Sequence, residues 1–420
     1  MTETKPFSIS KHVVWEAYRR VKSNKGSAGV DKQSIAEFEV ELKANLYRIW
    51  NRMSSGSYFP SPVRAVPIPK KSGGERLLGV PTVADRIAQT VVTLTLEPLL
   101  EPHFHEDSYG YRRGKSAHQA LAVTRKRCWE NDWVLEYDIR GLFDNIDHEL
   151  LLKALHHHVK DRWVLLYVQR WLTAPMQNRD GSLSMRDRGT PQGGPLSPVL
   201  ANLFLHYALD RWLSTTHKHI PFCRFADDGI LHCRSKSQAI YLHKQLVVRL
   251  DRCGLELHPD KTRIVYCKDA NRTKQHEAIA FDFLGFTFRP RRSINRRGVV
   301  FLCFSPSASR ESLKAMRQKV RRWRLHLKSG TSLRGLASQC AATIRGWMGY
   351  YGYFRRSEFQ IMARHIDRVL VRWAMRKYKR FHKRMGRAIA WLEKCFLSNR
   401  DMFPHWRLSN RFTVGTMGAQ

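Results

Sequence analysis

The alternation of apolar and polar residues predicts a chain that mixes helices with strands at first and becomes mainly helical near its end. Apolar residues recur at helical spacing between residues 10 and 55, where the glycines of residues 24–31 break the periodicity with a loop. Residues 63–80 alternate around a Gly-Gly turn and predict a β-hairpin with basic residues beside that turn. A helix is expected from about Val83 to Leu96, ending just before Glu97-Pro98, because proline disfavours the interior of a helix.

Shorter elements are expected in the middle of the chain. A strand over residues 133–138 ends in an acid, and the next helix covers residues 147–158. Ser197 is the expected N-cap of a further helix because a proline follows it at the first turn. The pattern over residues 223–233 indicates a strand, an acidic turn and a second strand. Beyond Pro306 the pattern is helical, basic and rich in Trp and Tyr.

The net charge narrows the class of protein. It is +37, from 73 Lys+Arg against 36 Asp+Glu, while 43% of the residues are hydrophobic, which excludes a disordered basic tail. Residues 289–420 hold 31 Lys+Arg and 5 Asp+Glu, a net of +26, which leaves +11 for the other 288 residues. Solvated helix faces would need acidic neighbours, and residues 372–387 contain none. The last third therefore predicts a module that binds nucleic-acid phosphates and releases their counterions.

Cysteine spacing and the length of apolar runs argue against zinc-ribbon, redox and membrane proteins. The eight cysteines include no Cys-x-x-Cys pair, which argues against a zinc ribbon or a redox motif and favours reduced thiols in the cytosol. No apolar run approaches the length of a bilayer span, and the N-terminus has no apolar signal region. We therefore expect a soluble protein that stays inside the cell.

Three acidic residues are candidates for metal chemistry. Asp227 and Asp228 lie side by side at the expected hairpin tip, and Asp138 ends an earlier strand. Adjacent carboxylates repel each other unless a cation holds them. Together the three could hold two Mg²⁺ ions about 3.5–4 Å apart, the arrangement that polymerases use for in-line displacement. Taken alone, Asp227-Asp228 could also be an ordinary acidic turn.

A loop between these acids suits nucleotide binding. Residues 189–198 (GTPQGGPLSP) are restricted by glycine and proline and lead into a helix. Such a segment can bring its backbone close to a nucleotide. The acids and the loop together point to chemistry on nucleoside triphosphates.

These features, in this order, resemble reverse transcriptases, and specifically those of group II introns. The resemblance rests first on residues 138–148 (DIRGLFDNIDH), 189–198 and 225–228 (FADD). It extends over about residues 20 to 400 through five further strings, which are 24–31 (NKGSAGVD), 67–86 (PIPKKSGGERLLGVPTVADR), 108–120 (SYGYRRGKSAHQA), 283–288 (FLGFTF) and 344–354 (IRGWMGYYGYF).

The resemblance implies an α+β fold of the right-hand polymerase type. Fingers with an N-terminal extension would cover residues 1–95, and a palm with an antiparallel sheet would cover residues 96–295. A helical thumb, or maturase domain, would follow over residues 296–385, with a short basic C-terminal tail over residues 386–420. The pattern sets the boundaries near 95 and 295 only approximately.

The same resemblance implies roles for residues of the palm. Asp138, Asp227 and Asp228 would bind the catalytic Mg²⁺ ions. Phe143 would occupy the space of a ribose 2′-hydroxyl and so select deoxynucleotides. A core phenylalanine is the alternative for Phe143.

Further residues would contact the substrates. Lys70 and Arg76 would clamp the incoming triphosphate, although in isolation they could form a solvated turn. Gln192 and Gly193 would contact the nascent base pair and the template strand. Lys261 would protonate pyrophosphate, with a capping or salt-bridging lysine as the alternative.

The basic last third supplies the candidates for RNA binding. Its aromatic cluster over residues 347–354 is more typical of a core than of a base-stacking surface. The arginines that flank the cluster are better candidates for contact with the RNA backbone: Arg345, Arg355 and Arg356. The acid-free stretch adds five more cations: Arg372, Arg376, Lys377, Lys379 and Arg380.

The chain departs from the family pattern in three places. Phe225 stands where Tyr is usual, which leaves the carboxylates intact, and His258 stands where Asn is usual, which weakens the assignment of Lys261. The sequence also ends soon after the expected thumb, without the Cys-pair endonuclease domain of many relatives. That feature resembles the group IIC lineage.

The implied function is RNA-directed DNA synthesis with Mg²⁺ and dNTPs, on an RNA template with a DNA primer or target DNA. The same chain would bind its parent group II intron RNA and promote splicing and retrohoming by target-primed reverse transcription, in the bacterial cytoplasm and at the nucleoid when bound to DNA. One alternative is a splicing-only maturase with a dead polymerase, against which the intact acids argue. The other is a free-standing reverse transcriptase recruited to host defence, which the sequence leaves open.

Overall fold

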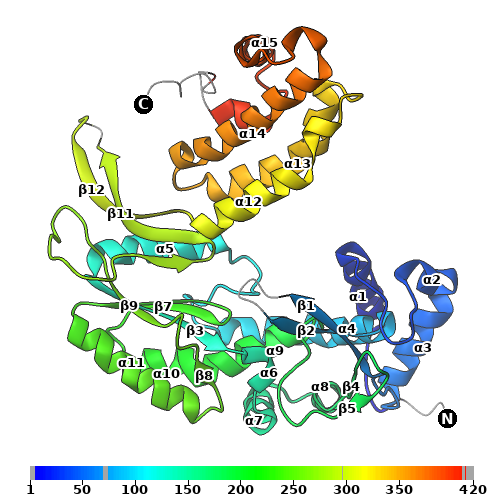
Figure 1. Cartoon of the computed structure of the whole chain (residues 1–420). Coiled ribbons are helices and arrows are strands. Elements are labelled where there is room, and N and C mark those ends of the chain that lie inside the picture. Colours follow the sequence, from blue (N-terminus) through cyan, green and yellow to red (C-terminus); the bar gives the residue numbers. More distant parts are fainter. Residues whose placement is uncertain (1–4, 70–73, 296, 409–411, 413–420) are drawn as a thin grey trace. The chain divides into compact units, whose positions relative to one another are not determined.

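The computed structural model describes residues 5–69, 74–295, 297–408 and 412, which form two compact units (Figure 1). The first unit takes residues up to 116 together with residues 135–264. The second takes residues 117–134 together with residues from 265 onward. Helices and three separate sheets make up the described residues, so the fold is α+β as predicted. Within the described residues, no helix is both long and apolar enough to span a bilayer.

Four helices open the first unit. They are α1 (Lys11–Asn24), α2 (Ile35–Val40), α3 (Leu42–Ser54) and α4 (Val83–Leu100). Ser10, Ser34 and Thr82 cap three of them by accepting backbone N–H hydrogen bonds. The loop expected over residues 24–31 joins α1 to α2, which confirms that prediction.

Helix α4 is longer than the sequence pattern predicts. It passes through Pro98, although we expected it to end before Glu97-Pro98. Pro98 lies in the last turn, where its missing N–H removes one helical hydrogen bond near the end of the helix. A buried surface on most sides of α4, including Ile87, Val91 and Leu96, stabilises the helix despite that loss.

The predicted hairpin is present as β1 (Val63–Pro69) and β2 (Glu75–Val80), which pair antiparallel. Strand β4 (Met176–Gln177) lies parallel to β1, and β5 (Leu183–Ser184) completes a four-stranded sheet. The helices α6 (Leu142–Asn145), α7 (His148–His158) and α8 (Arg162–Leu172) belong to the same unit. Asp147 caps α7 by accepting from Leu150 N, which confirms the start expected for this helix.

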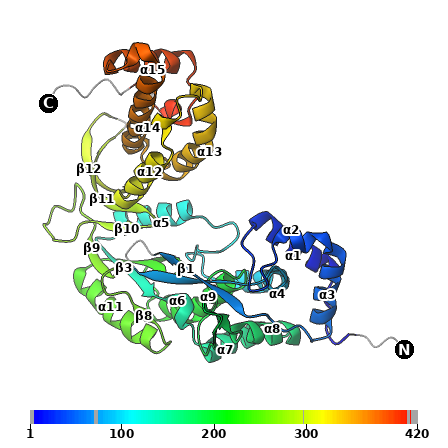
Figure 2. The same cartoon turned by 45° about the vertical axis from the view of Figure 1, so that its right-hand side comes forward.

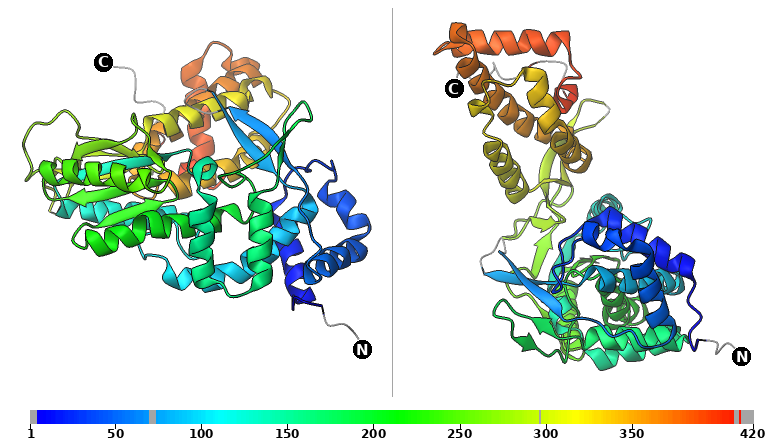
Figure 3. Two further views of the ribbon diagram at one scale, coloured as in Figure 1. Left: turned by 90° about the horizontal axis from the view of Figure 1, so that it is seen from below. Right: turned by 90° about the vertical axis from the view of Figure 1, so that its right-hand side faces the viewer.

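A second sheet carries the candidate acids. Its strands are β3 (Trp133–Arg140), β6 (Phe222–Phe225), β7 (Asp228–Cys233), β8 (Glu256–Leu257) and β9 (Arg263–Tyr266). They follow the order β6-β7-β3-β8, with β9 also paired to β3, and the two strands expected over residues 223–233 are confirmed. Helix α11 (Lys236–Asp251) packs against β7 and β8 (Figures 1 and 3).

Ser197 does not cap its helix. Helix α9 (Ser197–Leu205) begins at this residue, and the position before it, Leu196, makes no side-chain cap. The Ser197 hydroxyl instead donates to Pro191 O at 2.7 Å and lies 2.8 Å from Thr190 Oγ1, so it fastens the preceding loop. The helix continues through a π-helical turn (η2, His206–Asp210) into α10 (Arg211–Thr216).

The second unit combines a three-stranded sheet with helices. Helix α5 (Ala117–Glu130) accompanies β10 (Phe281–Phe283), β11 (Phe286–Ile294) and β12 (Val300–Ala308), which pair antiparallel (Figure 2). The long helices are α12 (Arg310–Arg322), α13 (Leu333–Tyr351), α14 (Arg356–Lys377) and α15 (Met385–Ser398). Short 3₁₀ turns lie at η1 (Glu101–His103, in the first unit), η3 (Leu325–Leu327), η4 (Lys379–Phe381) and η5 (Pro404–Leu408).

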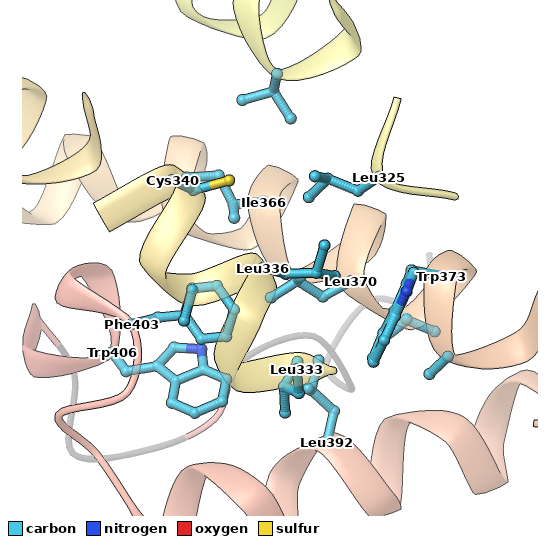
Figure 4. Close-up of a cluster of buried hydrophobic side chains, with 14 of the residues drawn as sticks. Leu325, Leu333, Leu336, Cys340, Ile366, Leu370, Trp373, Leu392, Phe403 and Trp406 are labelled. Atoms are coloured by element: carbon cyan, nitrogen blue, oxygen red, sulfur yellow. The ribbon is translucent and has the colours of Figure 1, made fainter. Parts of the chain in front are cut away.

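Residues 385–408 are not a basic tail. Leu392 of α15 packs into the same buried cluster as Leu333, and Phe403 and Trp406 join it from the segment that ends in η5 (Figure 4). These side chains are almost fully buried, because the apolar residues of this segment recur on one face while its charges point outward. The segment therefore belongs to the core of the second unit, which corrects the prediction of a tail at residue 386.

Candidate active site

Backbone pairing of the second sheet brings the three candidate acids together in the first unit. Asp228 is the first residue of β7, and Asp227 lies in the tight turn before it. Ile139 N donates to Asp227 O at 3.2 Å, so the turn lies beside the end of β3, where Asp138 stands. A side-chain hydrogen bond joins Asp228 to Asp138. The sequence prediction that these three acids meet at strand ends is therefore consistent with the geometry.

The pKa values of two of the acids are raised, as expected for carboxylates clustered at a cation site. Burial, the charge of Asp227 and the hydrogen bond to Asp138 together raise the pKa of Asp228 to about 8. Burial, and then the charge of Asp138, also raise the pKa of Asp227. Carboxylates that cannot all ionise in a half-buried cluster are stabilised when a divalent cation joins them.

The cluster is not a preformed cage. Across the described part of the chain, no group of three or more His, Cys, Asp or Glu side chains is already arranged to hold a metal ion. Mg²⁺ fits such an open site, because it usually takes one or two carboxylates and completes its shell with water and substrate phosphates. The donor set of oxygens alone also suits Mg²⁺ better than a softer metal.

Lys261 lies within the cluster. Its Nζ is 2.7 Å from Asp138 Oδ2, and His258 N donates to Asp138 O at 2.8 Å. Burial alone would lower the pKa of Lys261, but its hydrogen bond to Asp138 and the charges of the acids outweigh burial and raise it. The lysine is therefore charged in this state and makes the salt bridge that we considered as its alternative role.

Phe143 lies at the surface of the site. It is half-buried on the short helix α6, whereas its neighbour Leu142 is 2% exposed and fills the core. The rings of Phe143 and Tyr111 meet edge to face with centroids 6.2 Å apart. Phe143 is therefore less buried than Leu142, and its role at the ribose stays a prediction.

Tyr111 is a site residue that the sequence pattern did not single out. It is 54% exposed, with φ +58°, a conformation that is rare for a bulky side chain. Burial, and then the charge of Asp227, raise its pKa, while Arg76 lowers it. The one available signal was the glycine-flanked motif of residues 108–114, which indicates tight turns.

The residues expected to bind the nucleotide lie on β2 and on the loop that packs against it. The exposed Arg76 on β2 acts electrostatically on Asp227 and Tyr111, so it lies near both. Gly79 N donates to Gln192 O at 2.9 Å, and Gly193 has φ +134°, so the loop packs its backbone against β2. A Cβ on Gly193 would lie 2.6 Å from Gly79 O, which explains the glycine. Lys70 lies outside the described residues.

The candidate RNA-binding cations of the second unit differ in their surroundings. Arg355 donates to Arg292 O and Ser293 Oγ at 2.7 and 2.6 Å, and Lys377 donates to Ser329 O at 2.7 Å. These two are therefore occupied by contacts within the unit. The others are exposed: Arg345, Arg356, Arg372, Arg376, Lys379 and Arg380.

The aromatic cluster is mostly structural. Trp347 stacks on Trp323 at 5.7 Å, and Tyr350 Oη donates to Leu284 O at 2.9 Å. The prediction that these aromatics are core residues is confirmed for Trp347 and Tyr351, which pack on the buried cluster. Tyr353 is the exception, because it is 63% exposed and stacks on His118.

Comparison with known families agrees with the fold. Residues 68–288 match the family described as reverse transcriptase (RNA-dependent DNA polymerase), and the chain belongs to this family. Residues 313–391 match the maturase-specific domain of group II introns. The fold is therefore the α+β right-hand fold of reverse transcriptases.

Two of the relatives are bacterial proteins. The chain is 30% identical over 318 residues to Protein YkfC of Escherichia coli strain K12, a match that covers 66% of this chain and 80% of YkfC. It is 28% identical over 362 residues to the group II intron-encoded protein LtrA of Lactococcus lactis, covering 70% of this chain and 58% of LtrA. A telomerase structure from Candida albicans aligns over 89% of this chain and 68% of its own, with 11% identity and a TM-score of 0.45.

Proposed function

We propose that this protein is the RNA-directed DNA polymerase of a group II intron and that it also binds the intron RNA to promote splicing and target-primed reverse transcription. The observation that carries the polymerase activity is the cluster of Asp138, Asp227 and Asp228 at the strand ends, with Arg76 and Lys261 beside it. The matched maturase domain and the exposed cations of the second unit support the RNA-binding role. The bacterial relatives support a place in the bacterial cytoplasm, at the nucleoid when bound to DNA.

In this proposal each side chain of the site has its own role in nucleotide addition. Asp138, Asp227 and Asp228 would hold Mg²⁺, which when bound activates the primer 3′-hydroxyl and neutralises the leaving pyrophosphate. Arg76, together with Lys70, binds the phosphates of the incoming dNTP. Phe143 and Tyr111 line the space beside its sugar, and the loop at Gln192 and Gly193 contacts the new base pair.

Lys261 supplies the proton for the leaving group in this proposal. Its ammonium is charged and already lies at the acids. Asp138 would help to hold Mg²⁺, and Lys261, no longer paired with that carboxylate, would donate its Nζ proton to pyrophosphate. In this proposal Lys261 makes the salt bridge before metal and nucleotide bind and acts as the proton donor afterwards.

The decisive experiment is extension of a DNA primer on an RNA template by the wild-type chain and by Asp227→Asn. We expect the substitution to lower the rate by at least about 10²–10³, because it removes charge stabilisation at the reacting phosphate. Binding of intron RNA should change little, since phosphate contacts dominate that affinity. Asp251→Asn, at the exposed end of α11, is the matched control and should extend normally.

The outcomes separate this function from its alternatives. Normal extension by Asp227→Asn would refute the assignment of the acids. Splicing promoted by a wild-type chain that never extends a primer would favour a splicing-only maturase. Extension without preferential binding of the intron RNA would favour a free-standing reverse transcriptase recruited to another role.

A further inference from the structure

An ion pair lies buried directly behind the turn that carries Asp227. The side chains of Arg224 and Asp210 are both 0% exposed. Arg224 Nε donates to Asp210 Oδ1 at 2.7 Å, and Nη2 donates to Asp210 Oδ2 at 2.6 Å, so the pair is bidentate. This fork geometry fixes the guanidinium in one orientation.

The remaining donors of Arg224 bind three other segments. Nη2 also donates to Ser108 Oγ at 2.7 Å, while Nη1 donates to Asn202 Oδ1 at 3.2 Å and to Ala226 O at 3.1 Å. All five N–H groups of the guanidinium thus have an acceptor. The last of these acceptors, Ala226 O, belongs to the residue immediately before Asp227.

The turn that Arg224 holds through Ala226 O is strained and tightly enclosed. Ala226 has φ +58°, which costs a non-glycine residue free energy and persists only where the surroundings enforce it. On one side, a Cβ on Gly110 would lie 3.1 Å from Ala226 Cα, so the backbone of the 108–110 segment touches the turn. On the other side, Gly229 leaves no room for a Cβ beside the ring of Tyr137.

Stability alone gives little reason for this ion pair. Removing two charges from water costs about as much as their attraction returns, and apolar residues of similar volume often serve equally well. Asp210 also lies in a π-helical turn (His206–Asp210), an uncommon element that is often found at functional sites. The Arg224–Asp210 pair is therefore costly and lies partly in an uncommon turn. It is also hydrogen-bonded to Ala226, the strained residue before Asp227. Together these features indicate a role in the reaction.

We propose that Arg224 and Asp210 are positioning residues for polymerisation, which hold the Ala226 carbonyl and thereby fix the carboxylates of Asp227 and Asp228 for the metal ions. Neither side chain reaches the substrates. The inference rests on the proposed polymerase function and adds to it the residues that set the geometry of the acids. A displacement of the order of 1 Å at a reacting centre can lower a rate by about 100-fold.

The test replaces both charges at once in the full-length protein. Arg224→Met with Asp210→Leu removes the pair without leaving an unpaired buried charge. Arg170→Met is the control, because Arg170 is partly buried and, like Arg224, binds the backbone, donating to Gly56 O and Tyr58 O. Single-nucleotide addition is measured against dNTP and Mg²⁺ concentrations, together with the melting temperature.

A positioning role predicts a specific kinetic pattern. For the double variant, kcat should fall about 10- to 100-fold while KM for dNTP changes less than about threefold, with more Mg²⁺ needed for half-maximal rate. Arg170→Met should keep the wild-type kcat. Arg224→Lys, which restores the charge without the fork, should recover part of the rate that Arg224→Met loses.

The contrary results are equally distinct. If kcat per folded molecule of the double variant equals that of the wild type, the pair only stabilises the fold and the inference is wrong. If the double variant does not fold, Ser108→Ala decides, since it removes one acceptor of Arg224 and keeps the ion pair. An unchanged kcat and Mg²⁺ requirement for Ser108→Ala would then overturn the role. Failure of the wild-type chain to extend any primer would instead overturn the proposed polymerase function.

Discussion

Lys261 Nζ lies 2.7 Å from Asp138 Oδ2, so a lysine pairs with one of the three clustered carboxylates. The two residues stand on segments 123 positions apart, and the sheet brings them together. The ion pair balances one of the three acids, whereas burial and mutual repulsion outweigh the nearby cations at Asp227 and Asp228 and raise the pKa of both. The stability of the metal-free protein should therefore depend on pH through these two acids.

The first prediction is that metal-free protein loses stability as pH rises from about 4 to 8. The folded state raises the pKa of Asp228 from 3.8 to about 8, so it binds more protons than the unfolded state across this window. Stability gained from that proton is present at low pH and is lost as pH rises through the folded pKa. We expect a loss on the order of 1–3 kcal/mol, smaller than the full shift implies because the group is partly hydrated.

Thermal unfolding in EDTA at several pH values checks this prediction. Asp228→Asn should remove most of the pH dependence, so the difference in melting temperature between variant and wild type should grow from pH 5 to pH 8. Added Mg²⁺ should stabilise the wild type at pH 8 more than the variant, because it binds the ionised acids. Parallel pH curves for the two proteins would contradict the assignment of the charge cluster.

The second prediction concerns sugar selection. Phe143→Ala should raise the incorporation of ribonucleotides by about 10- to 200-fold relative to deoxynucleotides, because it removes a steric clash with the 2′-hydroxyl. Tyr111→Ala should have a smaller effect in the same direction, since it removes the ring that supports Phe143. Single-nucleotide kinetics with paired rNTP and dNTP substrates measure both.

Leu142→Ala is the control for sugar selection. Leu142 precedes Phe143 but is 2% exposed, so its loss should lower stability by about 2–5 kcal/mol and leave the ratio of the two substrates unchanged. Unchanged selectivity in Phe143→Ala would mean that another side chain excludes the 2′-hydroxyl.

The parts of the fold that the sequence predicted correctly are those with a local signal. The strands with Asp138 and Asp228 are short, mainly apolar runs with an acid at one end, and a tight turn follows from the pattern of residues 222–233. The partners of Arg224 could not be predicted in this way. Ser108, Asn202 and Asp210 are scattered through the chain, and each looks like an ordinary polar residue until the sheet and the π-helical turn bring them together.

The basic last third misled the sequence interpretation in two respects. Its high charge concealed the apolar face of residues 385–408, whose side chains at Leu392, Phe396 and Trp406 are buried. Charge counting also treated all cations alike, whereas Lys377 is held by the carbonyls of Ser329 and Thr331. The contacts of Lys377 depend on the position of the loop at residues 329–331, which the amino-acid composition does not specify.

The third prediction tests the role of α15 in the core. Leu392 is fully buried, whereas Leu397 on the same helix is 61% exposed. Leu392→Ala should lower the free energy of unfolding by about 2–5 kcal/mol, and Leu397→Ala should change it by less than about 0.5 kcal/mol. Denaturant titration of both variants measures the difference. Equal, small effects would show that residues beyond 385 are a dispensable tail after all.

The fourth prediction separates polymerisation from RNA binding. Four exposed cations of the second unit are replaced together by Gln, leaving out Lys377 because of its internal hydrogen bonds: Arg372, Arg376, Lys379 and Arg380. Intron binding should weaken, and the slope of log K against log salt should fall by roughly 0.7–0.9 for each phosphate that the protein no longer neutralises. Splicing at near-physiological salt should decline, whereas extension of a short, saturating primer–template should decline much less.

The matched control for this fourth experiment removes the same charge from exposed positions of the first unit: Lys153, Lys160, Lys244 and Arg252, each to Gln. If net charge alone attracts the intron, both quadruple variants should lose affinity equally; if the second unit binds specific phosphates, only its own variant should lose most of the salt slope. Asp227→Asn completes the comparison, since it should stop extension and still promote splicing. Splicing, extension and salt-dependent binding are measured on all three proteins. If splicing and extension fell in parallel in every variant, the assignment of extension to the acids and of intron binding to the cations of the second unit would be wrong. Two separable activities require two separable sets of residues.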